Sequence, residues 1–412
     1  MTDVPARPPI EARLVAAGLA PLPRTAWLEI DLDAIRGNLA VMRGLAGPDT
    51  PVRPVVKADA YGHGAVPVAV ALEAAGADGF CVATFDEAVQ LRDGGIRGPI
   101  RVLYPIPVGM AGEAARHGIV VSAGEPAGLE ALVRAAAAID PVRPLAIELE
   151  VETGLGRGGF DPSALVAAAR VVAAAPGLAL AGVWTHLQAV EDTPLTALQV
   201  ARFESASAAL VAAGIGSPPR HMAASAGLLA DGVLAYEGVR PGLAIYGLVP
   251  DEVAGTVSTE AAAGLRPAMA LYARPVRVAD LPAGHGISYG PTFRTARPSR
   301  IATLPLGYGD GWSRQLSNRA TAIVRGRRVP LVGNVAMDAV MADVTDVPGR
   351  PVDTTDEFVL LGASGAERIT AGELAQERTT NSWEVVTAMS RRLPRVYHAA
   401  AGPVGLRTLT EP

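Results

Sequence analysis

The sequence predicts an α/β fold in which an N-terminal (β/α)8 barrel of the TIM type is followed by a C-terminal, mostly β domain. From Trp27 to about Val239, short apolar runs alternate with Ala-rich segments of helical period, a pattern typical of βα units. Eight such apolar runs occur, and most are continuous, as expected of parallel strands that are buried on both faces. After about Ala261 the runs become β-branched and few helical segments separate them.

The predicted barrel elements follow one another in regular order. The strand candidates are residues 51–58, 78–83, 99–104, 118–123, 144–151, 179–186, 218–225 and 236–242. Helical segments such as residues 66–77, 85–95 and 162–177 lie between them. Eight strands in this order favour a closed barrel. An open, doubly wound parallel sheet is the alternative, because periodicity alone is a weak guide to the number of strands.

The second domain is predicted from a change of pattern. Its strand candidates are residues 269–281, 300–311, 321–333 and 339–346, and residues 370–379 and 382–392 have helical spacing. We expect the last residues, 402–412, to fray. The predicted organisation is a flexible N-terminal arm at 1–24, a barrel domain at 25–260 and a β domain at 261–412.

Composition narrows the class of protein. The net charge of −5 leaves no basic footprint, so nucleic acid is not an expected partner. No apolar run reaches the roughly 20 residues that a membrane span requires. The single cysteine, Cys81, excludes a disulfide within the chain. The first residues carry acids and prolines and do not resemble an export signal, so we expect a cytoplasmic enzyme.

One lysine stands out in this chain. Lys57 is the only lysine among 36 Lys and Arg residues. An arginine stays protonated at any working pH, whereas a lysine amine can lose its proton and attack a carbonyl. Lys57 also closes the first strand candidate, and catalytic groups gather at the carboxyl ends of barrel strands. The position therefore predicts covalent chemistry, with chance survival of a surface lysine as the alternative.

Three carboxylates alternate with apolar residues in the fifth strand candidate. Glu148, Glu150 and Glu152 share one face of a strand, because the side-chain period is two. If this face is the barrel interior, cations must lie nearby, and Arg157 after a Gly-rich turn is one candidate. A solvated edge strand and an oxygen-ligated metal site are the alternatives.

Further polar residues follow other strand candidates. His186 and Arg240 each end an apolar run, which favours one shared site over separate structural roles. Tyr61 either reaches a phosphate or carboxylate or covers the barrel rim, and His63 is interpreted as a hydrogen-bonded surface residue.

The motifs along the chain resemble those of the alanine racemase family. The segment VVKADAYGHG at residues 55–64 is similar to the cofactor-lysine signature of that family. Further resemblances follow in order: ETGLGRGGF, VWTHL, ASAG, VRPGLAIYG, ISYGPTF, LGYGDGW, GNVAMDAV and RLPRVY. The resemblance implies a pyridoxal 5'-phosphate enzyme, an isomerase with a βα barrel and a β domain.

The same resemblance implies a role for each matching residue. Lys57 would hold the cofactor and move the α-proton on one face, and Tyr289 from the other subunit of a homodimer would act on the opposite face. Arg240 would face the pyridine nitrogen, with His186 beside the ring. The remaining implied contacts are Tyr61, Ser225, Gly242 and Trp383 to the phosphate end of the cofactor, and Arg157 and Met337 to the substrate carboxylate. No metal site is implied.

The chain departs from the family pattern in three places, of which the first two matter most. Glu150 stands seven residues before Arg157, where many members have a lysine that carries a carbamate, so we expect Glu150 to supply the anion that orients Arg157. Trp383 stands where the family usually has a tyrosine at the mouth of the active site. Ala224 also replaces an asparagine that often precedes the serine.

The expected function is the interconversion of L-alanine and D-alanine, which supplies D-alanine for peptidoglycan. A racemase of broader or different amino-acid specificity is the alternative that Trp383 keeps open. A D-amino-acid aldolase or dehydratase of similar fold is a further alternative, and it would need metal ligands in the second domain. A carrier of the cofactor without catalysis would lack that domain.

Overall fold

The computed structural model describes residues 7–140, 142–230, 234–255, 263–400 and 402–410. The chain divides into two compact units. The first unit is Ile35–Arg266, and the second combines Met1–Ala34 with Pro267–Pro412. Each unit is described below by itself.

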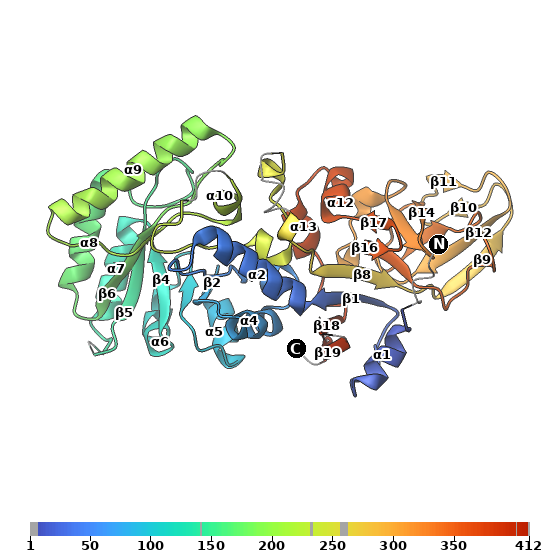
Figure 1. Ribbon diagram of the computed structural model, residues 1–412, viewed down its shortest axis with the longest axis horizontal. Helices are drawn as coiled ribbons and strands as arrows, with labels where there is room; N and C mark the ends of the chain where they lie inside the picture. The colour runs from blue at the N-terminus through green and yellow to red at the C-terminus, as the bar shows by residue number, and fades with distance from the viewer. Residues whose placement is uncertain (1–6, 141, 231–233, 256–262, 401, 411–412) are drawn as a thin grey trace. The chain divides into compact units, whose positions relative to one another are not determined.

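A curled, parallel sheet forms the centre of the first unit (Figure 1). Its six strands are hydrogen bonded in the order in which they occur in the chain: β2 (Phe80–Val82), β3 (Ile100–Val102), β4 (Ile119–Ala123), β5 (Leu145–Glu150), β6 (Leu178–Trp184) and β7 (Arg220–His221). Most of their residues are buried, in keeping with the continuous apolar runs of the sequence.

The first and last strand candidates are present as short bridged segments. Main-chain contacts join them to each other and to both edges of the sheet. These contacts are the parallel bridges Val52–Val239 and Val55–Cys81, and the hydrogen bond from Arg240 N to Ala223 O at 2.9 Å. Because the sheet edges meet through these segments, the predicted (β/α)8 barrel is confirmed and the open sheet is wrong.

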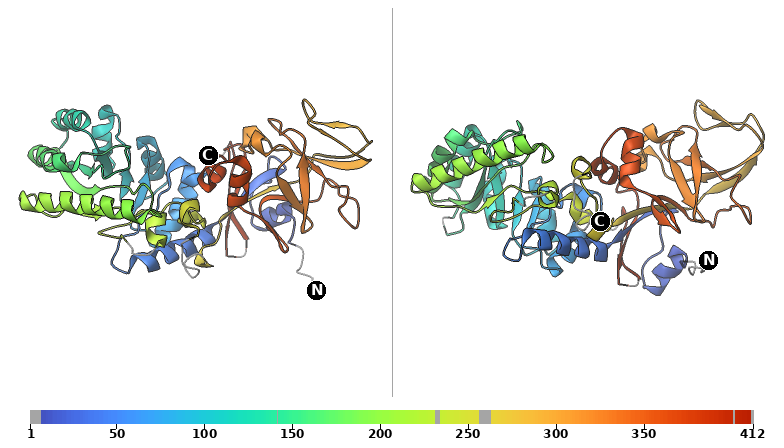
Figure 2. Two further views of the ribbon diagram at one scale, coloured as in Figure 1. Left: turned by 90° about the horizontal axis from the view of Figure 1, so that it is seen from above. Right: turned by 45° about the horizontal axis from the view of Figure 1, so that its top comes forward.

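Helices cover the outside of the barrel strands. They are α2 (Leu32–Ala46), α4 (Ala65–Ala74), α5 (Phe85–Asp93), α6 (Ala111–Arg116), α7 (Pro126–Ala136), α8 (Leu165–Ala174), α9 (Thr193–Ala212) and the short α10 (Ser225–Leu229). Helix α7 begins where the Glu125 carboxylate accepts a hydrogen bond from Gly128 N at 2.7 Å. It buries Leu129, Leu132 and Ala136, a spacing that keeps one helix face against the sheet. Figure 2 shows the long helix α9 on the outside, beside α8.

The second unit is built on a large, mostly antiparallel sheet. Its strand order is β19-β18-β1-β8-β16-β13-β14-β15-β12-β9, with β17 paired to β16. The strands are β1 (Ala26–Asp31), β8 (Met269–Ala273), β9 (Arg277–Leu281), β12 (Ser299–Leu304), β13 (Thr321–Val324), β14 (Arg327–Val332), β15 (Val340–Asp343), β16 (Phe358–Ser364), β17 (Glu367–Ile369), β18 (Arg395–Ala399) and β19 (Gly402–Arg407). A separate pair joins β10 (Gly286–Ile287) to β11 (Phe293–Arg294). The predicted mostly β second domain is confirmed.

Both ends of the chain differ from the expectation. Strand β1 belongs to the second unit, where it pairs in parallel with β18 and antiparallel with β8. The expected arm at 1–24 contains helix α1 (Ile10–Ala16), whose Ile10 and Leu14 are buried. The C-terminal residues do not all fray, because β19 pairs with β18. The predicted domain limits therefore stay predictions, and residues 26–31 join a sheet that the barrel rhythm did not indicate.

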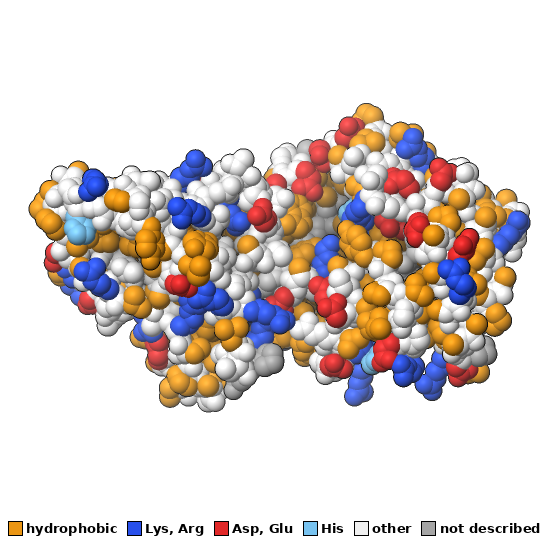
Figure 3. Space-filling model, turned by 180° about the vertical axis from the view of Figure 1, so that it is seen from behind, with side chains coloured by type: hydrophobic (Ala, Val, Ile, Leu, Met, Phe, Trp, Pro, Cys, Tyr) orange, Lys and Arg blue, Asp and Glu red, His pale blue; other side chains and the backbone are white. Residues whose placement is uncertain are grey.

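Two surface properties bear on the class of protein. Among the described residues, none of the helices combines the length and the apolar character needed to cross a bilayer. On the face drawn in Figure 3, acidic and basic side chains are interspersed with apolar ones.

Candidate active site

Lys57 is placed by an unusual turn of the backbone. The four residues after it, Ala58 to Tyr61, all have positive φ, between 50° and 57°. Non-glycine residues in this left-handed region cost roughly 1 kcal/mol or more each, and they persist only where their surroundings hold them. The carboxylate of Glu87 accepts a hydrogen bond from Ala58 N at 2.5 Å, and Asp59 Oδ1 accepts one from Ala65 N at 2.9 Å. These contacts fix the backbone that directly follows Lys57.

The rings around this turn support it from within. Tyr246 donates a hydrogen bond to Val55 O at 2.8 Å, and its ring stacks on His63 with 4.5 Å between centroids. The Nδ1 atom of His63 lies 3.0 Å from the carbonyl oxygens of Ala60 and Tyr61. His63 is only 1% exposed, so its interpretation as a surface residue is wrong. The two buried rings brace the left-handed turn.

The surroundings of Lys57 lower the pKa of its amine. Burial lowers the pKa of Lys57, and the positive charges of Arg157 and Arg240 lower it further. Burial and the charges of Arg240, Arg157 and Lys57 likewise lower the pKa of His186 to about 3, so this imidazole is neutral at physiological pH. Positive charge is therefore in excess around His186.

The carboxylates of strand β5 are buried, not solvated. Strand β5 is flanked by β4 and β6, and Glu148 and Glu150 are 2% and 8% exposed, so the edge-strand alternative is wrong. Glu150 Oε1 lies 3.4 Å from Arg157 Nη2, in agreement with the predicted pair. Burial raises the pKa of Glu150, and Arg157 opposes this rise only in part. Glu152 instead accepts a hydrogen bond from Gly156 N at 2.9 Å and so closes the Gly-rich turn.

The alternative that these carboxylates bind a metal ion has no support in the described ranges. There, no group of three or more His, Cys, Asp or Glu side chains has an arrangement that could hold a metal ion.

Arg240 is buried and makes several hydrogen bonds. Its side chain is 2% exposed, and Nη2 donates to Thr185 O at 3.0 Å and to Met222 O at 3.2 Å. The same nitrogen lies 3.5 Å from His186 Nδ1, and Nη1 is hydrogen bonded to His221. Burial lowers the pKa of Arg240 to about 10, so the guanidinium stays protonated at neutral pH.

Tyr61, Ser225 and Gly242 form a small cradle. Ser225 Oγ accepts hydrogen bonds from Gly242 N at 2.9 Å and from Ala244 N at 3.1 Å. A Cβ atom on Gly242 would lie 2.7 Å from the Tyr61 hydroxyl, so only glycine fits there. Burial raises the pKa of Tyr61, which keeps the phenol protonated. The cradle therefore offers hydroxyl groups next to a bare stretch of backbone.

The other three predicted residues lie in the second unit. Tyr289 is in the loop between β10 and β11 and is 77% exposed. Asn334 donates a hydrogen bond to Tyr289 O at 2.8 Å, which holds the backbone while the ring stays in solvent. Met337 is 52% exposed. Trp383 is half-buried in the first turn of α13 (Ser382–Thr387), which Asn381 caps.

The structure thus brings the predicted barrel residues to one end of the strands. Those residues are Lys57, Tyr61, Arg157, His186, Ser225, Arg240 and Gly242, and each follows a strand or bridged segment in the chain. Sequence reasoning missed Glu87 and His221. The spacing of Thr84 and Glu87 matches a capping box and indicates the start of α5. It does not reveal that Glu87 also reaches Ala58.

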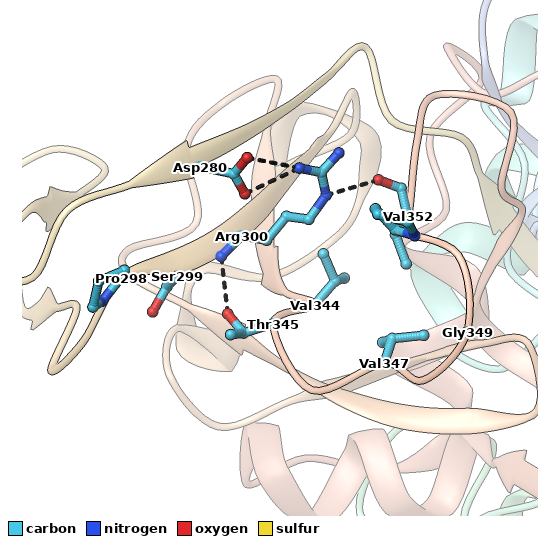
Figure 4. A pocket seen from close by; sticks show the side chains of 10 residues that line it. Asp280, Pro298, Ser299, Arg300, Val344, Thr345, Val347, Gly349 and Val352 are labelled. Carbon is cyan, nitrogen blue, oxygen red and sulfur yellow. Dashed lines mark hydrogen bonds and ion pairs between the residues drawn. The ribbon is translucent and has the colours of Figure 1, made fainter.

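A pocket of about 440 Å³ lies elsewhere, in the second unit (Figure 4). Arg300 lies in its wall, where Nη1 donates to Asp280 Oδ2 at 2.9 Å and Nε donates to Val352 O at 3.0 Å. Because Asp280 and Arg300 neutralise each other, this pair adds no net charge to the pocket. None of the predicted site residues lines it.

The fold and the site together define a class: a two-unit enzyme in which a lysine at the end of the first barrel strand lies near two arginines, the buried Arg240 and the exposed Arg157. Comparison with known proteins is more specific. The model of the alanine racemase N-terminal domain matches residues 30–250, and that of the alanine racemase C-terminal domain matches residues 268–397. The chain belongs to the alanine racemase family.

Individual relatives agree over almost the whole chain. An alanine racemase of Symbiobacterium thermophilum is 43% identical over 91% of this chain and 97% of its own length. One of Desulfosudis oleivorans is 40% identical over 90% and 96%. Among solved structures, alanine racemase from Bacillus anthracis with bound L-Ala-P has a TM-score of 0.87 and 32% identity, covering 95% of this chain and 99% of that one. The enzyme from Streptomyces lavendulae has a TM-score of 0.83 and 36% identity, with coverage of 92% and 98%.

Proposed function

We propose that this protein is an amino-acid racemase that interconverts L-alanine and D-alanine and uses pyridoxal 5'-phosphate. Membership of the alanine racemase family supports the reaction, as do relatives that carry this name over nearly their full length. The observation that carries the proposal is Lys57: the only lysine of the chain ends the first barrel strand, and its pKa is lowered by burial and by two neighbouring arginines.

The barrel residues fit this cofactor. The positive charges of Arg157 and Arg240 near Lys57 suit a phosphorylated anion. The hydroxyls of Tyr61 and Ser225, beside the bare backbone of Gly242, would bind the phosphate end. A Cβ atom at position 242 would collide with the Tyr61 phenol. Lys57 would hold the aldehyde end through its amine.

Two bases on opposite faces would account for inversion. The cofactor, when bound, supplies an electron sink for the charge that develops at Cα. Lys57 Nζ would remove or return the α-proton on one face, which a lowered pKa favours. The Oη of Tyr289 of the partner subunit would act on the other face. The 77% exposure of Tyr289 in the chain supports this, because the ring is open to a second subunit.

Arg240 and His186 would shape the surroundings of the pyridine ring. Arg240 would donate a hydrogen bond to the ring nitrogen without giving up its proton, because its pKa of about 10 keeps it charged at neutral pH. An arginine at this position, unlike a carboxylate, would limit the negative charge that the ring takes up, which would favour racemisation over transamination. His186 is neutral beside Arg240 and would add no further positive charge.

The substrate carboxylate would be bound by Arg157 together with Met337. Glu150 would orient Arg157, in place of the carbamate-bearing lysine of many family members. The protein would work as a cytoplasmic homodimer and supply D-alanine for peptidoglycan. No metal ion and no nucleic acid has a part in the proposal.

Chemical trapping of the cofactor tests the proposal directly. Purified protein is incubated with pyridoxal phosphate, reduced with borohydride, digested and examined by mass spectrometry. The cofactor should be found on Lys57, and the variant Lys57→Arg, which keeps the charge but cannot bond the aldehyde, should trap none. Trapping at an α-amino group alone would contradict the proposed site.

The reaction is tested in deuterium oxide with a panel of L-amino acids. We expect α-proton exchange and inversion with alanine, and no reaction in Lys57→Arg. Absence of exchange with every amino acid would instead favour a carrier of the cofactor.

One residue favours a second candidate, a racemase of broader specificity. Trp383 stands where the family usually has a tyrosine, and an indole is larger and only donates a hydrogen bond. The same panel decides between the two: inversion of a bulkier amino acid at a rate comparable to that of alanine would support the broader racemase, and restoration of alanine preference by Trp383→Tyr would assign it to this residue.

A further inference from the structure

The barrel interior contains a buried polar layer that the proposed function does not use. Arg101 on β3, Glu148 on β5 and His221 on β7 come from alternate strands, as the side chains of one layer do in (β/α)8 barrels. Such layers are usually filled by branched apolar residues, but Glu148 is 2% exposed and His221 is 1% exposed. Burying charged side chains costs free energy. We therefore expect this layer to have a role that offsets the cost.

Glu148 determines which nitrogen of His221 carries a proton. Its Oε1 accepts from Arg101 Nε at 2.8 Å, and its Oε2 lies 3.0 Å from His221 Nε2. Burial alone raises the pKa of Glu148, but His221 and Arg101 outweigh burial and hold that pKa below its ordinary value. The ionised carboxylate can only accept hydrogen bonds. His221 must therefore carry its proton on Nε2.

The opposite side of the imidazole requires the same tautomer. Arg240 Nη1 is hydrogen bonded to His221 Nδ1, and a guanidinium has donors but no acceptor. Nδ1 must therefore be unprotonated. Burial, together with Arg240 and Arg101, lowers the pKa of His221 to about 4 in spite of Glu148, which agrees with a neutral ring.

The indole ring of Trp184 packs against both His221 and Arg240. His221 stacks on Trp184 with 6.0 Å between ring centroids and 9° between planes. The guanidinium carbon of Arg240 lies 5.0 Å from the centroid of the same indole. Rotation of His221 would therefore disturb the hydrogen bond that orients Arg240.

We propose that Glu148 is a positioning residue for Arg240, because it fixes His221 in the tautomer whose bare Nδ1 accepts a hydrogen bond from the Arg240 guanidinium. The consequence for catalysis rests on the proposed function, in which Arg240 meets the ring nitrogen of the cofactor. The assignment of the tautomer does not rest on it.

The isosteric variant Glu148→Gln is diagnostic for a physical reason. A glutamine has one acceptor and one donor group, whereas both Arg101 Nε and the protonated His221 Nε2 are donors. If the amide NH2 faces His221, the proton must move to Nδ1 and oppose Arg240. If the amide NH2 faces Arg101, it lies opposite Arg101 Nε, and both groups are donors. In the first orientation the tautomer of His221 changes, although the volume of the side chain at position 148 does not.

The first measurement uses the wild-type holoenzyme. The chain has six histidines, few enough for nitrogen-15 NMR of labelled imidazoles, with His221 assigned by the loss of its signals in His221→Gln. We expect a proton on Nε2 and an unprotonated Nδ1 at neutral pH. A proton on Nδ1, or a doubly protonated ring, would overturn the proposal even if no variant folds.

The second measurement compares Glu148→Gln with the control Glu237→Gln, which breaks the exposed ion pair of Glu237 with Arg220 next to His221. For Glu148→Gln we expect a changed tautomer and a kcat lower by roughly 10-fold or more, the size seen when a group that orients a ligand is lost at metal sites. KM for alanine should stay within about twofold, because the change affects the reacting state more than substrate binding. Glu148→Asp should restore the tautomer in part, and the control should match wild type.

The two proposals fail in different ways. A folded Glu148→Gln enzyme with an unchanged tautomer and unchanged kcat would overturn the positioning role and leave the racemase standing. A wild-type protein without racemase activity that shows the predicted tautomer would overturn the function and leave the hydrogen-bond assignment intact.

Discussion

The two units hold their candidate site residues in opposite ways. In the barrel unit, Arg240 is 2% exposed and its guanidinium is bonded to two main-chain carbonyls and an imidazole. In the second unit, Tyr289 and Met337 are 77% and 52% exposed. The barrel therefore organises its share of the site by its own packing, whereas the loops of the second unit present side chains that only another surface would cover.

The units also differ in what a buried carboxylate does. In the barrel, Glu148 reaches Arg240 through His221. In the second unit, Glu29 is 7% exposed and is paired with Arg7, with Arg13 at 2.8 Å and with His398 at 2.9 Å. These partners come from the N-terminal segment and from β18, so Glu29 ties the ends of the chain to the sheet. A buried, paired carboxylate is thus no sign of a catalytic site by itself.

The largest expected effect concerns the second unit, where Tyr289 is exposed. Tyr289→Phe removes one hydroxyl from a solvent-exposed ring, and we expect kcat for alanine racemisation to fall by about 10² to 10⁴, the usual contribution of a general acid or base. One of the two faces would lose its proton donor, while exchange from the Lys57 face would persist in deuterium oxide. Tyr236→Phe, which removes a hydroxyl bonded to Glu204, is the matched control. Equal kcat in both variants would show that Tyr289 has only a surface role.

The next effect concerns stability instead of catalysis. Glu29→Gln should lower the free energy of unfolding by on the order of 2 kcal/mol, because it removes the buried counter-charge of Arg7 and Arg13, and it should leave kcat unchanged. Glu11→Gln, which breaks the half-exposed ion pair with Arg274, should cost less than about 1 kcal/mol. Urea denaturation of both variants, alongside a racemase assay, checks this. A loss of kcat without a loss of stability would contradict the structural role.

The same carboxylate gives a pH dependence of known sign. Burial would raise the pKa of Glu29, but His398, Arg13 and Arg7 lower it well below its ordinary value of 4.5. A carboxyl with a depressed pKa stabilises the folded state above its unfolded pKa, and this contribution is lost as the pH falls. Below about pH 4.5, wild-type stability should therefore fall more steeply than that of Glu29→Gln.

The smallest expected effect concerns the barrel unit, whose site residues are held by its own packing. Glu150→Gln removes the negative charge beside Arg157, and we expect KM for alanine to rise roughly tenfold, corresponding to about 1.4 kcal/mol for a hydrogen bond to a charged group. Steady-state kinetics with Glu130→Gln, a change of an exposed residue on α7, provide the comparison. Unchanged substrate affinity and turnover would refute the orienting role of Glu150.

Much of the barrel was predictable because its signals are local. The continuous apolar runs and the helical spacing between them correspond to the observed strands and helices. Residues 26–31 fall inside the range 25–260 that was predicted for the barrel domain, but they form β1 in the sheet of the second unit. Its partners in β18 and β8 are hundreds of residues away in the chain. Pairing over such separations leaves no local pattern.

The sequence by itself determined the order of βα units, the change to a β-rich second half, and the isolation of one nucleophilic amine at the end of a strand, because periodicity and residue chemistry are properties of short segments. Only the tertiary structure decided the left-handed turn after Lys57 and the contact of Glu148 with His221 and Arg101. Those features depend on side chains from separate strands that meet in one buried layer. Burial then sets which of them are charged.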